Sequence, residues 1–225
     1  MKNQLRHSLK AAFMAAALCM LSIPTTMAAE GNSDPAKLGV LWWQHVASIP
    51  AAQNPLFDLT GAFCTVGQRD DEWFLHGLTY PGNSLGDPIV RNCTIPTGKQ
   101  IFVPFINWVC VPYPGETIPQ NVGFCKDAND LTDLTSLAID GQARNDLIER
   151  IVQKKAFDLT VPDSNAFGWP SGVFTAVHDG YFARLPKLGA GHHTIHIQGG
   201  VSAFDFYIDL IYEIDIVEPG QMPAP

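Results

Sequence analysis

Apolar and polar side chains alternate most clearly near the C-terminus, over residues 206–217. The apolar positions are Ile208, Leu210, Tyr212, Ile214 and Ile216, and the acidic positions between them are Asp209, Glu213 and Asp215. A period of two residues is that of a β-strand with one buried face and one solvated face. Similar runs at residues 156–161, 173–185 and 191–198 predict further strands in the second half of the chain.

Four apolar runs in the first half predict two more strand pairs. Residues 62–67 and 72–78 flank a polar turn, and residues 90–95 and 100–106 flank Pro96-Thr97-Gly98. Pro104 lies inside the last run, where it predicts an edge strand or a β-bulge.

Helical spacing is confined to the start and the middle of the chain. Asp34 and Pro35 form a helix start, and apolar residues then recur with a helical period until Pro50. Residues 129–138 and 145–153 have the spacing of short helices. The sequence therefore predicts a mainly β fold. We expect a β-sandwich of jelly-roll or immunoglobulin-like kind, with an N-terminal amphipathic helix and short helices in the middle.

The first 28 residues have the pattern of a signal peptide. Lys2, Arg6 and Lys10 are basic, residues 11–23 are apolar, and Ala28 ends a small-residue cleavage site. This predicts a periplasmic or secreted protein, with residues 29–225 as a single β-sandwich domain that does not insert into the membrane. Those residues carry 11 basic and 22 acidic side chains, a net charge of −11, which disfavours nucleic acid as a partner.

Four cysteines follow the predicted signal peptide, and their even number favours disulfides in an oxidising compartment. We predict the pairs Cys64–Cys93 and Cys110–Cys125, because each bond closes a local loop. The first pair is expected to join two strands. The second is expected to close a Pro- and Gly-rich segment that regular structure cannot order.

Several short blocks resemble a family of uncharacterised exported bacterial proteins. They are Trp42-Trp43, Asn54-Pro55, Asp58-Leu59-Thr60-Gly61, Cys64 and the later Gly191-His192-His193-Thr194-Ile195-His196. The resemblance implies export and a β-rich single domain. It implies no activity and no site residue.

Catalytic and metal-binding patterns are weak. A hydrolase could use Asp58 with Asp71 or Glu72, and a metalloenzyme could use His178 with His192 or His196. Against the metal site, His192 and His196 lie about 13 Å apart along a strand, too far to share one ion. No catalytic residue, metal or cofactor is therefore predicted, and the enzyme reading stays an alternative.

Aromatic residues in Pro- and Gly-rich segments are the better functional indication. Trp108, Tyr113 and Trp169 are of this kind, and exposed rings stack on sugars or pack against proteins. The leading hypothesis is thus an exported, disulfide-stabilised binding module. Its partner would be a carbohydrate or a cell-envelope or surface protein, bound through these three residues.

Overall fold

The computed structural model describes residues 34–69 and 71–222, so the predicted signal peptide lies outside the described residues. The elements are α1 (Pro35–Ser48), η1 (Ala51–Gln53), η2 (Pro55–Phe57), β1 (Glu72–Phe74), β2 (Ile89–Pro96), β3 (Gln100–Cys110), α2 (Ile118–Asn129), β4 (Leu134–Ile139), β5 (Gln142–Ala143), η3 (Asn145–Leu147), β6 (Ile148–Val161), β7 (Gly172–Arg184), β8 (Gly191–Val201), η4 (Ser202–Phe204), β9 (Phe206–Val217) and η5 (Pro219–Gln221).

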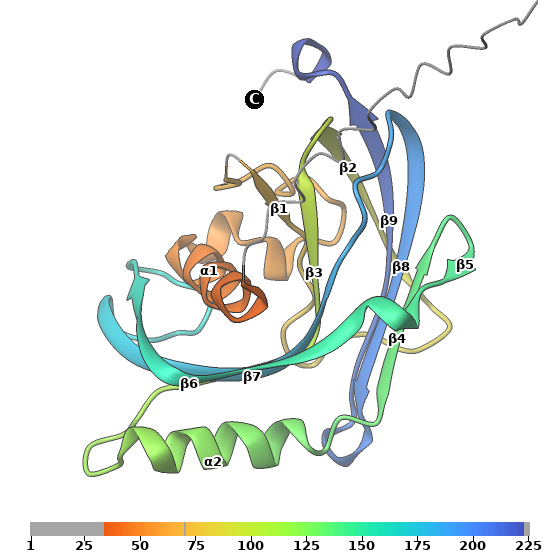
Figure 1. The fold of residues 1–225 in the computed structure, drawn as a ribbon. Helices are drawn as coiled ribbons and strands as arrows, with labels where there is room; N and C mark the ends of the chain where they lie inside the picture. Colours follow the sequence, from red (N-terminus) through yellow and green to blue (C-terminus); the bar gives the residue numbers. More distant parts are fainter. Residues whose placement is uncertain (1–33, 70, 223–225) are drawn as a thin grey trace, which may run out of the picture. The chain divides into compact units, whose positions relative to one another are not determined.

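Two packed sheets form the framework, which confirms the mainly β prediction. One sheet has the order β1-β3-β7-β6 and the other β2-β9-β8-β4-β5. The pairs β1–β3 and β2–β9 are parallel, and the remaining neighbours are antiparallel. Figure 1 shows α1 on one face of the first sheet, and α2 with the second sheet on the other.

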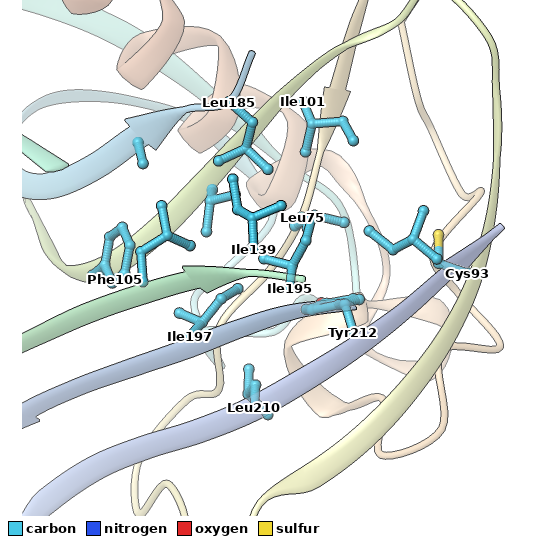
Figure 2. Close-up of a cluster of buried hydrophobic side chains, with 14 of the residues drawn as sticks. Leu75, Cys93, Ile101, Phe105, Ile139, Leu185, Ile195, Ile197, Leu210 and Tyr212 are labelled. Atoms are coloured by element: carbon cyan, nitrogen blue, oxygen red, sulfur yellow. The ribbon is translucent and has the colours of Figure 1, made fainter. Parts of the chain in front are cut away.

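The main core lies between the two sheets. Leu75 and Ile101 reach it from the first sheet and its flank, and Ile195, Ile197 and Leu210 reach it from the second (Figure 2). All five are at most 2% exposed, and burying a side chain of this size stabilises the fold by about 1.5–3 kcal/mol. The alternation predicted over residues 206–217 is therefore confirmed as the two faces of β9.

Helix α1 forms as predicted and covers the other face of the first sheet. The Asp34 carboxylate accepts a hydrogen bond from the Ala36 N–H at 3.0 Å, and Pro35 occupies the first turn. Leu38, Trp42 and their apolar neighbours on the helix pack against the sheet in a second core cluster. The Trp42 indole N–H also donates to the Leu75 carbonyl at 2.9 Å.

Three predictions about individual elements are wrong. Residues 62–67 form turns, with the left-handed backbone of Gly61 and Gly67 at either end. Residues 134–138 and 148–153 of the two expected helices are extended, as part of β4 and the start of β6, and the central helix is instead α2, which ends at Asn129. Strands β2 and β3 do not pair with each other but lie in different sheets, because each strand has a better long-range partner, β9 and β7. The register shift between Pro104 and Asn107 confirms the predicted bulge.

Both predicted disulfides are present. The Cα atoms lie 5.8 Å apart in Cys64–Cys93 and 5.9 Å apart in Cys110–Cys125, within the usual range. Cys64 lies in a turn and Cys125 in α2, so neither bond joins two strands as was expected for the first. The bonds indicate folding in an oxidising environment. Over residues 34–69 and 71–222, no helix has the length and apolar character needed to cross a bilayer.

Candidate ligand-binding groove

A hollow of about 510 Å³ opens where the loop after β3, helix α2 and the loop before β7 meet. We call it the aromatic groove; the lining side chains that matter here are Tyr113, Glu116, Gln120, Phe124, Trp169 and Phe174. A volume of this size suits a small ligand or a short segment of a polymer.

Asn165 fixes the position of Trp169 at one side of the groove. Its side-chain amide donates to the carbonyls of Pro162 and Trp169, at 2.9 and 2.6 Å. Its carbonyl oxygen accepts from the N–H groups of Phe167 and Trp169, at 3.0 and 3.1 Å. The Trp169 ring then packs between Phe167 and Phe174, with centroids 4.9 and 5.4 Å away. The Asn165 amide thus forms hydrogen bonds with four backbone groups of this loop, and the Trp169 indole is held in position before a ligand binds.

A tight turn presents Tyr113 and Glu116 on the facing side. Pro114 and the left-handed Gly115 occupy its two central positions, and the Glu116 N–H donates to the Tyr113 carbonyl at 2.9 Å. In return the Glu116 Oε2 accepts from the Tyr113 N–H at 2.9 Å and from the Asn121 amide at 3.0 Å. These two donors hold the pKa of Glu116 below its usual value, so the groove carries an ionised carboxylate at neutral pH.

Helix α2 supplies the third wall. The Thr117 hydroxyl and the Gln120 side chain form a capping box, which starts the helix immediately after the turn. Phe124 lies one turn further along and is 65% exposed. The Cys110–Cys125 disulfide ties the helix to the end of β3 beside this wall, so it holds two of the three lining segments together.

The structure brings together two of the three predicted ligand-binding residues. Tyr113, which is 76% exposed, and Trp169 both line the aromatic groove. Trp108 does not line it. Its ring packs against Phe204, 5.7 Å between centroids, and its indole N–H is buried with no hydrogen-bond partner in the described part of the chain. Trp108 is therefore a packing residue.

Sequence reasoning missed Glu116 and Phe124 as groove residues. Phe124 is the residue before Cys125, so its exposure depends on which helix face the disulfide turns inward. Glu116 follows a Pro-Gly pair, which is a turn signal. That signal could have placed its carboxylate beside Tyr113.

Asp58, which both proposed hydrolase pairs share, is engaged by the backbone of its own turn. Asp58 is 5% exposed and accepts hydrogen bonds from the N–H groups of Thr60, Gly61 and Phe63. Burial alone would raise the pKa of Asp58, but these bonds outweigh it and hold the pKa below the usual value. Its oxygens are thus used in ordering the turn. Neither Asp58 nor Asp71 lines the aromatic groove.

The three histidines of the metal alternative are divided between the two sheets. His178 is on β7, buried under α1, whereas His192 and His196 are on β8 in the second sheet. His192 lies 2.9 Å from the carboxylates of both Asp215 and Glu213, which raise its pKa. A hollow of about 430 Å³ lies beside His192, and none of the described residues that line it is Tyr, Trp or Phe.

His196 lies 2.6 Å from Asp209. Among the residues that the structure describes, no three His, Cys, Asp or Glu side chains are placed to hold a metal ion. The histidines on β8 are therefore held by carboxylates rather than gathered around a common centre.

Comparison with protein-family models, with curated proteins and with solved structures finds no match to this chain.

Proposed function

We propose that this protein is an exported, disulfide-stabilised module that binds carbohydrate in the aromatic groove. The observation that carries the proposal is the convergence of Tyr113, Phe124 and Trp169 around one hollow with polar groups at its margin. Aromatic faces pack against the C–H faces of sugar rings, and the polar groups at the margin can bond hydroxyls. The export signal predicted over residues 1–28 and the oxidised cysteines support an extracytoplasmic setting.

Preorganisation is the second support. Asn165 fixes the Trp169 loop, and the Cys110–Cys125 bond fixes α2 against β3, so the two sides of the groove are ordered before a ligand arrives. A site that is already ordered loses less conformational entropy on binding. A protein that binds its ligand without transforming it needs a preordered groove of this kind and needs no catalytic group.

The test is a screen of envelope and plant glycans by calorimetry, with alanine variants of the groove. Trp169→Ala and Tyr113→Ala should each weaken binding by about tenfold, which corresponds to 1.4 kcal/mol of lost stacking. Tyr80→Ala is the matched control, because Tyr80 is 72% exposed, like Tyr113 at 76%, but does not line the groove. Equal affinities in all three variants would show that the ligand binds elsewhere.

A fluorescence experiment separates contact from indirect effects. The chain has five tryptophans, and Trp169 alone among them lines the groove. Trp169→Phe keeps an aromatic ring, so calorimetry should still detect binding while the ligand-induced change in tryptophan emission disappears. If the emission change persists in Trp169→Phe, the ligand does not sit on Trp169. Binding of an envelope protein but of no glycan would replace the carbohydrate proposal.

A further inference from the structure

Of the described residues that line the aromatic groove, Glu116 is the one with a charged side chain. We propose that the preferred ligand is a positively charged carbohydrate, an oligosaccharide whose amino-sugar units carry free ammonium groups. This inference rests on the proposed function and names the class of sugar that the same groove selects.

Glu116 is held in place without a cation of its own. Within the described residues, its side chain accepts two hydrogen bonds, both on Oε2, one from the Tyr113 N–H and one from the Asn121 amide. Asn121 is only 5% exposed and also donates to the Thr117 carbonyl at 3.3 Å, so it cannot easily swing away. Across residues 34–69 and 71–222, no Lys, Arg or His forms an ion pair with Glu116. The Oε1 atom is thus left for a ligand cation.

The surrounding rings favour the same charge. Tyr113 lies three residues from Glu116 in one turn, and Trp169 and Phe124 line the same hollow. The face of an aromatic ring carries negative potential, so an ammonium group close to it gains a cation–π contact in addition to its ion pair. A neutral sugar would gain the stacking alone. A small cation alone would gain the contacts with Glu116 and the ring faces, but it would leave the apolar side chains of the groove exposed to water.

The charge of the whole chain acts in the same direction. Beyond the predicted signal peptide there are 11 basic and 22 acidic residues, and a net negative protein attracts a polycation and repels a polyanion. This long-range term raises the association rate for any cation. The net charge does not determine where on the protein an ammonium group binds. That position would be set by a direct contact with the Glu116 carboxylate.

The experiment compares glucosamine oligomers with N-acetylglucosamine oligomers of the same length. Calorimetry is run at about pH 6, where most of the amines carry a proton and the Glu116 carboxylate stays ionised. The wild-type protein should bind the free-amine oligomer at least about tenfold more tightly. Glu116→Gln should lower that affinity by about tenfold and leave the affinity for the acetylated oligomer within about twofold. The free-amine affinity should also fall as salt is raised.

Asp127→Asn is the matched control, because it removes one negative charge from an exposed position on α2 outside the groove lining. It should reduce binding far less than Glu116→Gln. Melting temperatures of both variants are measured first, so that a disrupted turn is recognised.

Three results would overturn the inference: equal affinity for the two oligomers, preference for the acetylated one, or a Glu116→Gln variant that weakens both equally. In each case the carbohydrate proposal stands. If neither oligomer nor any other glycan binds, both proposals fail together.

Discussion

Acidification from pH 7.5 to pH 5 should destabilise this fold strongly, because three histidines are buried and none of them pairs with a carboxylate within the described residues. His45, His76 and His178 are at most 3% exposed. Nδ1 of His45 is hydrogen-bonded to the Gly67 carbonyl at 3.0 Å, and its ring stacks on His76 with centroids 5.1 Å apart. Burial lowers the pKa of His45 and of His178 to about 4, and burial together with His45 and Arg91 lowers that of His76 well below 6.5.

The sign of the effect follows from which state binds protons more readily. In the unfolded chain these histidines titrate near pH 6.5, so between pH 6.5 and pH 4 the unfolded state carries more protons than the folded state. Histidines buried in the neutral form make their full contribution to the free energy of unfolding above pH 6.5. This contribution is lost as the pH falls from 6.5 towards 4. For His45 and His178 the loss at pH 5 is about 2 kcal/mol each, about 4 kcal/mol together. His76 adds to it in the same direction.

Few other groups change this result within the same window. His192 works in the opposite direction, because its carboxylate neighbours raise its pKa, but its side chain is exposed and the pair is screened by solvent. The carboxylates with lowered pKa values, Asp58 and Asp209 among them, lose their contribution only below their ordinary value of 3.8. The window from pH 7.5 to pH 5 therefore reports mainly on the buried histidines.

Urea denaturation followed by tryptophan fluorescence measures the free energy of unfolding at the two pH values. With a urea dependence of roughly 2 kcal/mol per molar, the midpoint should fall by about 2 M. His178→Leu is the informative variant. The His178 ring nitrogens have no hydrogen-bond partner in residues 34–69 and 71–222, so an apolar replacement should cost little at pH 7.5 and remove about 2 kcal/mol of the loss at pH 5. A wild-type difference below about 1 kcal/mol, or an unchanged difference in His178→Leu, would refute the reasoning.

Two further predictions concern stability. Replacing Cys110 and Cys125 by Ser should lower the free energy of unfolding by about 3 kcal/mol, and replacing Cys64 and Cys93 by nearly 4 kcal/mol, because the second loop is longer; equal stability of the reduced and oxidised proteins in urea would contradict this. Asp58→Ala should cost about 2–3 kcal/mol at neutral pH, since three backbone N–H groups lose a charged acceptor, and the cost should shrink below about pH 3.8 as the wild-type carboxyl takes up a proton; a cost that does not depend on pH would point to packing instead.

The elements that could be predicted are those whose signal is local. The alternation in residues 206–217, the capped start of α1 at Asp34 and the bulge after Pro104 depend on neighbouring residues, and all three are found. The prediction of a helix over residues 129–138 was wrong because a short apolar run fits both the helical period and the strand period. The strand conformation is stabilised there by the pairing of six residues of β4 with β8, which is distant in sequence.

The apparent hairpin between β2 and β3 failed for a related reason. Pro96-Thr97-Gly98 is a good turn, but a turn does not decide which sheet each strand joins. Strand β2 finds eight partner residues on β9, from Ile89 with Leu210 to Pro96 with Val217. Strand β3 packs between α1 on one side and the second sheet on the other, and its two edges are paired with β1 and β7, so no edge is left for β2.

The aromatic groove shows the same division between local and long-range information. Composition could nominate Trp108, Tyr113 and Trp169, but not which of them meet. The antiparallel register of β3 and β7 contributes to that, because Cys110 pairs with Val177 at the end of β3, and Tyr113 and Phe174 each lie three residues from this pair and line the same groove. Trp108 lies two residues before the paired end of β3, still inside the sheet. A shift of a few residues along one strand thus separates a packing tryptophan from a residue that can contact a ligand.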